Sequence, residues 1–109
     1  MKILFICSQN RWRGLTAERL PGRNAHPSAR LGAGTEPGAR VRVTAGHLGW
    51  ADIIFVMERR HTDRLRAKFA PQLAGKPVIC LRIPDNYQFQ DPMLQELLRE
   101  RLQPFLPEL

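Results

Sequence analysis

The sequence predicts a small three-layer α/β domain, in which a parallel sheet is flanked by helices on both faces. Three short runs of apolar, β-favouring residues, at 3–6, 53–57 and 78–81, are typical of strands that are buried on both sides. Each run is followed by polar or helix-favouring sequence, and strands that alternate with helices indicate βαβ units. The 109 residues leave room for one domain, which we expect to span 1–109.

The first half of the chain begins with the strand at 3–6, which is followed by a short helix-compatible segment at 15–20. The stretch 21–46 is rich in Gly, Pro, Arg and Ala and has the weakest pattern. It contains two candidate strands, 29–33 and 41–44, and the sequence does not decide between them.

The second half has clearer helices. Residues 58–73 carry leucine or phenylalanine at every fourth position from 65 to 73, with Arg and Lys on the opposite face, which predicts an amphipathic helix. Asp91 and Pro92 have the form of an N-cap followed by proline at the first helical position. After them, apolar residues recur at helical spacing: Leu94, Leu97, Leu98, Leu102 and Phe105.

Composition excludes several classes of protein. Hydrophobic residues make up 43% and charged residues 25%, which is an ordinary globular balance. No apolar run approaches the ~18 residues that a membrane span needs, and the N-terminus lacks the features of a signal peptide. We therefore expect a cytoplasmic protein with a mature N-terminus and no membrane association. Two cysteines, Cys7 and Cys80, cannot form a disulfide framework, and no Cys/His cluster has zinc spacing.

The charge is unusually positive. Seventeen Lys and Arg residues against ten Asp and Glu residues give +7, and most of the excess lies in residues 1–55. Such a field favours anionic ligands, including phosphate esters, nucleic acid and acidic partners. Taken alone, the charge is more simply explained by a compositional bias that reflects codon usage and solubility.

The loop after the first strand is the place to look for chemistry, because ligands of open α/β sheets bind outside the carboxyl ends of the strands. Cys7 and Arg13 are separated by five residues in this loop. Unpaired backbone N–H groups before a helix favour a thiolate and form an anion site. The planar guanidinium of Arg13 matches two phosphate oxygens. The alternative is a buried structural cysteine in a chance spacing.

Several further motifs resemble the low-molecular-weight protein tyrosine phosphatases, and more closely a short bacterial group of predicted phosphatases in that superfamily. They run in family order along almost the whole chain, with 21–43 the least clear. The matching segments are 5–13, 16–18, 33–35, 50–58 and 83–87. The resemblance implies a four-stranded parallel sheet, in the flavodoxin-like order 2-1-3-4, flanked by helices.

The resemblance also implies residue roles. Cys7 would be the nucleophile that forms a cysteinyl-phosphate, while Arg13 and the loop amides hold the equatorial oxygens. Asn10 matches an asparagine that braces the loop, and its alternative role is that of a turn residue. No cofactor and no metal are implied. The phosphate-binding set comprises Ser8, Gln9, Asn10, Arg11, Trp12 and Gly14.

Two aspartates compete for the role of general acid. Asp91 is explained as a helix cap, whereas Asp85 matches the family acid and follows the third clear strand. We therefore expect Asp85 to protonate the leaving oxygen and later to activate water. Its alternative is a turn aspartate. Trp12 and Tyr87 would form the walls of the entrance, and the alternative for either is core packing.

The chain departs from the family pattern after its arginine. Gly14 and Leu15 stand where the family has Ser or Thr and then Pro. The missing hydroxyl predicts slow breakdown of the cysteinyl-phosphate, unless Ser8 or Thr16 substitutes for it. A second cysteine near the nucleophile is also missing, and we expect Cys80 to be a core residue.

The remaining polar residues give weaker signals. His26, His47 and His61 are scattered along the chain, so surface or packing roles are the expected ones. Arg59 and Arg60 are expected on a solvated face, with recruitment of a long anionic substrate as the alternative.

Three functions follow from these observations. The first is a metal-independent phosphatase acting on a phosphate monoester, with phosphotyrosine in a phosphoprotein as the family default. The second keeps the chemistry but acts on nucleotide or RNA-end phosphates, including cyclic ones, because bases stack on aromatic side chains and phosphates pair with Arg. The third is a phosphate-binding module whose turnover was lost with the change to Gly14.

Overall fold

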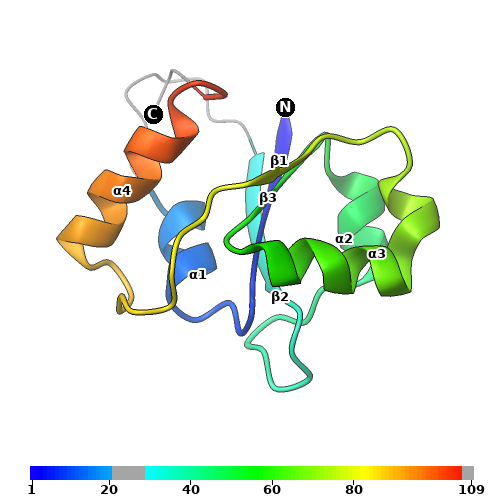
Figure 1. The fold of residues 1–109 in the computed structure, drawn as a ribbon, viewed down its shortest axis with the longest axis horizontal. Helices are drawn as coiled ribbons and strands as arrows, with labels where there is room; N and C mark the ends of the chain where they lie inside the picture. Colours follow the sequence, from blue (N-terminus) through cyan, green and yellow to red (C-terminus); the bar gives the residue numbers. More distant parts are fainter. Residues whose placement is uncertain (21–28, 107–109) are drawn as a thin grey trace.

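A computed structural model describes residues 1–20 and 29–106 of the chain (Figure 1). His26 lies outside these described residues. The element order is β1 (Lys2–Cys7), α1 (Arg13–Glu18), β2 (Ala29–Gly34), α2 (Ala45–Trp50), β3 (Ile53–Val56), α3 (Arg59–Leu73), β4 (Val78–Cys80) and α4 (Pro92–Leu102). The strands form one parallel sheet in the order β2-β1-β3-β4, which confirms the expected α/β fold and strand order.

Strand β1 lies in the interior of the sheet and pairs with β2 on one side and β3 on the other. Its residues Ile3 to Ile6 are all at most 1% exposed. Ile3 and Phe5 face one layer of helices, whereas Leu4 and Ile6 face the other. The run is continuously apolar because successive side chains of a central strand must fill two separate cores.

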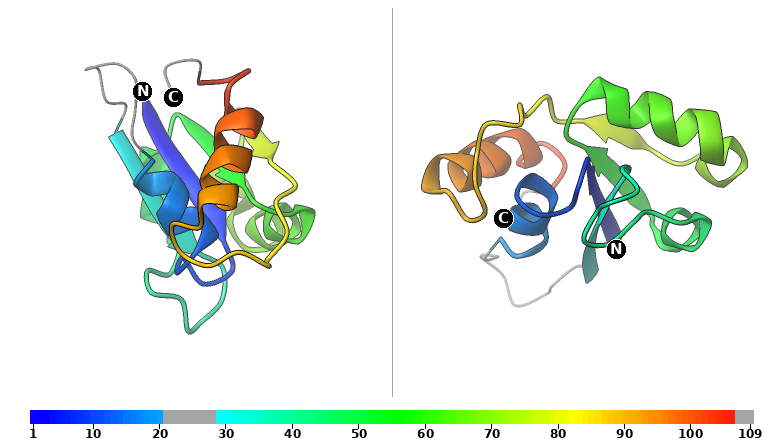
Figure 2. Two further views of the ribbon diagram at one scale, coloured as in Figure 1. Left: turned by 90° about the vertical axis from the view of Figure 1, so that its left-hand side faces the viewer. Right: turned by 90° about the horizontal axis from the view of Figure 1, so that it is seen from below.

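Two core clusters lie on opposite faces of the sheet. The α1/α4 cluster contains Leu94, Leu98 and Leu102 of α4, and the α2/α3 cluster contains Leu48 of α2 and Leu65 of α3. Figure 2 shows the corresponding layers, with α1 and α4 on one side of the strands and α2 and α3 on the other. The carboxyl end of β1 is at Cys7, and the loop of residues 8–12 leads from it to α1 (Figure 1).

The structure decides between the two candidate strands in the weak stretch. The first candidate becomes β2, while the second contributes one isolated bridge, Gly34 to Arg42. Helix α2 was not expected from the sequence. Its N-cap is Thr44, whose hydroxyl accepts the backbone N–H of His47 at 3.2 Å. Glycines within its six residues obscure the helical pattern, since glycine disfavours a helix interior.

The two longer helices largely follow the expected bounds. Asp91 caps α4 as expected, because its carboxylate accepts the backbone N–H of Met93 at 2.9 Å. Helix α3 is kinked at Phe69, two residues before Pro71. Within residues 1–20 and 29–106, no helix has the length and apolar character required to cross a membrane.

Candidate active site

The loop after β1 joins Cys7 to the first helical residue of α1, Arg13. The carbonyl oxygens of Cys7, Ser8 and Gln9 accept backbone N–H groups from residues 35–40 at 2.8 to 2.9 Å. These three bonds fasten the outer side of the loop to the segment that follows β2. The loop is therefore held by backbone contacts rather than by its side chains alone.

The thiol of Cys7 lies at the floor of this loop and is only 3% exposed. Its Sγ accepts the backbone N–H of Asn10 at 3.0 Å. Asn10 has a φ of 54°, in the left-handed region that asparagine tolerates better than most residues. Its side-chain amide donates to the carbonyl of Gly32 at 3.0 Å, so Asn10 is both a turn residue and a brace between the loop and β2.

Gly14 packs closely against the thiol of Cys7. A Cβ added at Gly14 would lie 3.0 Å from Cys7 Sγ and 3.2 Å from Asn10 Oδ1. That Oδ1 atom is buried and has no hydrogen-bond partner among the described residues. A hydroxyl at position 14 would therefore reach two atoms that lack a side-chain donor. Thr16 Oγ1 accepts the N–H of Gln90 at 2.9 Å, and among the described residues no hydrogen bond joins Thr16 to Cys7 Sγ.

Arg13 is buried, with 2% of its side chain exposed. Its Nη1 donates to the carbonyl of Ile83 at 2.9 Å and to the carboxylate of Glu58, and its Nε lies 3.6 Å from Asp85 Oδ1. Glu58 also accepts from Arg60 at 3.1 Å. Partial burial acts to raise the pKa of Glu58, but hydrogen bonds from the two arginines outweigh it and lower that pKa below its usual value. Glu58 thus stays ionised and fixes the guanidinium of Arg13.

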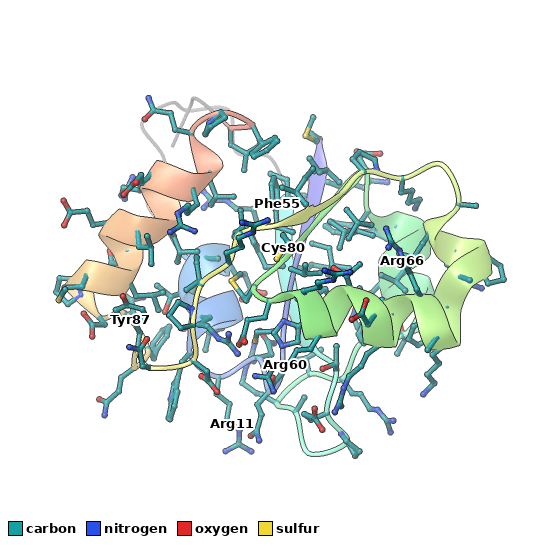
Figure 3. All side chains as sticks on the ribbon, viewed as in Figure 1. Arg11, Phe55, Arg60, Arg66, Cys80 and Tyr87 are labelled. Carbon is teal, nitrogen blue, oxygen red and sulfur yellow. The ribbon has the colours of Figure 1, made fainter. Side chains whose placement is uncertain are left out.

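A pocket of about 610 Å³ opens above this floor. Figure 3 shows Arg11, from the loop, and Arg60, from the first turn of α3, at the same end of the molecule. Trp12 is 46% exposed at the pocket. The lining residues are Cys7, Ser8, Gln9, Arg11, Trp12, Arg13, Glu36, Pro37, Gly38, Arg60 and Asp85. The pocket thus brings together a thiol, a buried guanidinium and a carboxylate.

Three of the expected site residues do not line this pocket. Asn10 and Gly14 lie beneath it, in contact with the floor. Tyr87 is half-buried and packs against the α1/α4 cluster (Figure 3). Asp85 does line the pocket, with 47% of its side chain exposed. Among the described residues, no group of three or more His, Cys, Asp or Glu side chains is placed to hold a metal ion.

Sequence reasoning missed two residues behind the pocket. Glu58 is the ion-pair partner of Arg13, and His61 is 1% exposed, with its Nε2 3.0 Å from Ser8 Oγ. The expectation that His61 has only a surface or packing role overlooked this hydrogen bond. A usable signal was present, because a polar residue and a histidine three positions later can form a reciprocal helix cap. The backbone N–H of Glu58 does donate to His61 Nδ1 at 3.0 Å.

Burial of His61 makes the stability of the fold depend on pH. Desolvation first, and then the charges of Arg13 and Arg60, lower the pKa of His61 from 6.5 to about 4. In the unfolded chain His61 binds a proton below pH 6.5, whereas in the folded chain it binds one only below about pH 4. The contribution of neutral, buried His61 to the free energy of unfolding is therefore complete above pH 6.5, and it is lost as the pH falls from 6.5 to about 4.

We expect wild type to lose about 2 to 3 kcal/mol more unfolding free energy than His61→Gln between pH 7.5 and 4.5. Urea denaturation at the two pH values measures the difference, and the paired carboxylates are common to both proteins. Equal losses in the two proteins would show that His61 titrates normally in the folded state.

Searches against protein-family models and curated proteins find no match to this chain. Solved structures do match it. The tyrosine phosphatase Wzb from Escherichia coli K30, in complex with phosphate, has 24% identity and a TM-score of 0.75, over 99% of this chain and 97% of that one. The low molecular weight protein tyrosine phosphatase from Streptococcus pyogenes has 16% identity and a TM-score of 0.75, over 99% and 92%.

The YwlE arginine phosphatase from Geobacillus stearothermophilus is a third similar structure, with 18% identity and a TM-score of 0.63, over 98% of this chain and 96% of that one. At these identities the likeness establishes the fold. The chain therefore has the fold of the low molecular weight protein tyrosine phosphatases over nearly its full length, as its sequence motifs led us to expect.

Proposed function

We propose that this protein is a metal-independent phosphatase that hydrolyses phosphate monoesters through Cys7. The observation that carries the proposal is the pocket, which joins the thiol of Cys7, the buried guanidinium of Arg13 and the carboxylate of Asp85. A thiol, a fixed cation and a carboxylate are the groups that a covalent phosphoryl-transfer reaction needs. The fold shared with two tyrosine phosphatases and an arginine phosphatase supports it.

In the first step, the thiolate form of Cys7 attacks phosphorus in line with the leaving oxygen. The S–P bond forms, the P–O bond breaks, and Asp85 gives its proton to the departing oxygen. Arg13 and the N–H groups of the loop hold the equatorial oxygens, where charge gathers in the transition state. Because Arg13 is 2% exposed and held by Glu58 and Ile83, its charge is poorly screened and its position is set in advance.

In the second step, a water molecule attacks the phosphorus of the cysteinyl-phosphate. Asp85, now ionised, accepts a proton from this water, the S–P bond breaks, and the Cys7 thiolate and inorganic phosphate are released. The N–H of Asn10 stabilises the departing sulfur, since it already donates to Sγ at 3.0 Å. No side-chain hydroxyl is available at position 14 for the same task.

Introducing that hydroxyl is expected to accelerate the second step. We predict that Gly14→Ser raises kcat for an aryl phosphate several-fold, because one neutral hydrogen bond contributes about 1 kcal/mol. The matched control is Gly14→Ala, which adds the Cβ that would lie 3.0 Å from Sγ but no donor. Quenched-flow kinetics measures the two steps separately. An unchanged kcat in Gly14→Ser, with no phosphocysteine accumulating in wild type, would rule out a slow second step.

Replacement of Asp85 tests the proposed general acid. We predict that Asp85→Asn lowers kcat/KM, which reports the first step, by about 10²- to 10⁴-fold for an alkyl phosphate, whose leaving oxygen needs a proton. The loss should be much smaller for a nitrophenyl phosphate, whose leaving group departs as an anion. Asp91→Asn is the control, because Asp91 caps α4. Equal losses of kcat/KM on both substrates would show that Asp85 does not protonate the leaving oxygen.

The substrate proposed first is phosphotyrosine in a phosphoprotein. A second candidate is a nucleotide or RNA-end phosphate, which is favoured by the exposed indole of Trp12 and the guanidinium of Arg11 at the pocket. Comparison of kcat/KM for a phosphotyrosine peptide, a mononucleotide, an RNA-end phosphate and a cyclic phosphate separates the two. Tight phosphate binding without turnover of any ester would instead favour the binding module.

A further inference from the structure

The tautomer of His61 is fixed by the N-terminal cap of α3. The backbone N–H of Glu58 donates to His61 Nδ1 at 3.0 Å. A ring nitrogen that accepts a hydrogen bond carries no proton, so the neutral ring holds its hydrogen on Nε2. The ring is buried to 1% exposure in the first turn of α3, which Figure 1 shows beside the loop that follows β1.

This tautomer sets the direction of the bond between His61 and Ser8. The two atoms, Nε2 and Oγ, lie 3.0 Å apart. Since Nε2 carries the hydrogen, it donates and the Ser8 oxygen accepts, and the hydroxyl must direct its own hydrogen elsewhere. For residues 1–20 and 29–106, the structure records no second partner for Ser8 Oγ. Ser8 lines the pocket next to Cys7, so a ligand in the pocket is the available acceptor.

We propose that His61 is a positioning residue, which turns the Ser8 hydroxyl into a hydrogen-bond donor for the phosphoryl group held over Cys7. This inference rests on the proposed function, because it adds a donor to the same phosphate site. Such a donor is useful here for two reasons. The guanidinium of Arg13 is shared with Glu58 and Asp85, and the N–H of Asn10 is already directed at Sγ.

The charge state of the ring supports this direction of donation. Arg13, Arg60 and Arg64 oppose protonation of His61, and Glu58 favours it, but burial is the largest influence and the pKa falls to about 4. The ring is therefore neutral near pH 7, and Nδ1 remains free to accept the N–H of Glu58. The donor role of Nε2 then holds throughout the neutral range.

The chain supplies a matched control for a purely structural role. Helix α2 begins with the same arrangement, in which the backbone N–H of Thr44 donates to His47 Nδ1 at 3.0 Å. His47 occupies the same helical position as His61, but among the described residues its ring bonds only Thr44, whereas the ring of His61 also bonds Ser8 of the pocket lining. If His61 served only to cap α3, replacing either histidine would affect stability and leave phosphate binding unchanged.

The test is a double-mutant cycle on the affinity for inorganic phosphate, measured by isothermal titration calorimetry at pH 7. We expect Ser8→Ala to weaken binding by about 10- to 100-fold, the range for a hydrogen bond to a charged group. His61→Leu should weaken it similarly, and Ser8→Ala/His61→Leu no further. His47→Leu should bind as wild type does. His61→Gln should recover most of the loss, because its amide both accepts from Glu58 and donates to Ser8.

Unchanged phosphate affinity in Ser8→Ala overturns the proposal, and this variant decides even if His61→Leu fails to fold. Additive losses in the double variant overturn it as well, because His61 would then act independently of Ser8. The cycle measures binding and needs no turnover. If the protein hydrolyses no ester, the proposed function is wrong. If hydrolysis depends on Cys7 but not on Ser8, only the proposed role of His61 and Ser8 is wrong.

Discussion

Cys7→Ser is expected to lose at least about 10⁴-fold of kcat against an aryl phosphate, because the nucleophile of covalent catalysis cannot be replaced by its neighbours. A serine hydroxyl ionises far less readily than a thiol. The substitution is nearly isosteric at a site that is 3% exposed, and the N–H of Asn10 keeps an acceptor. Folding should therefore be preserved, as circular dichroism would show.

The matched control is Cys80→Ser. Cys80 is the other cysteine of the chain, and it is half-buried against the α2/α3 cluster, away from the lining of the pocket. Its replacement should leave kcat unchanged. Activity of Cys7→Ser equal to that of Cys80→Ser would mean that the thiol at the pocket floor is not the nucleophile.

Arg13→Lys is expected to lower kcat/KM by about 10²- to 10³-fold although it conserves the charge. Lysine has a single nitrogen and no planar fork, so it cannot keep the bonds to the carbonyl of Ile83 and the carboxylate of Glu58 and also present two N–H groups to phosphate oxygens. Most of the loss should be in kcat, because the guanidinium holds oxygens that gain charge in the transition state.

Arg101→Lys provides the control for Arg13→Lys. Arg101 also donates to backbone carbonyls, those of Leu81 at 2.6 Å and Arg82 at 3.2 Å, but it is not among the residues that line the pocket. It should retain wild-type kinetics. If Arg13→Lys changed KM alone, Arg13 would bind substrate without stabilising the transition state.

The fold was largely predictable because a central parallel strand imposes a strong constraint on sequence. Ile3 to Ile6 fill two cores at once, so the run is unbroken and easily recognised. Asp91 and Pro92, as an N-cap followed by proline, likewise predict where α4 begins. Helix α2 escaped prediction because two glycines, Gly46 and Gly49, lie within its six residues. The choice between the two candidate strands depended on pairing with β1, which a local pattern does not contain.

The site was predictable where its parts are contiguous in sequence. Cys7 and Arg13 lie on one loop, so their spacing is informative by itself. Glu58 and His61 follow β3, and their role arises only because β3 lies beside β1 in the sheet. With the order 2-1-3-4 in hand, the residues directly after β3 were the ones to examine for partners of the loop. Their hydrogen-bond directions still required side-chain positions.

The central claim is that a covalent bond forms between Cys7 and phosphorus. Acid quenching during turnover of a ³²P-labelled monoester, followed by proteolysis and mass spectrometry, tests it most directly. We expect a phosphoryl group on the peptide that contains Cys7, more of it in wild type than in Gly14→Ser, and none in Cys7→Ala. Steady hydrolysis with no phosphocysteine at any quench time, and with label transferred directly to water, would contradict the account.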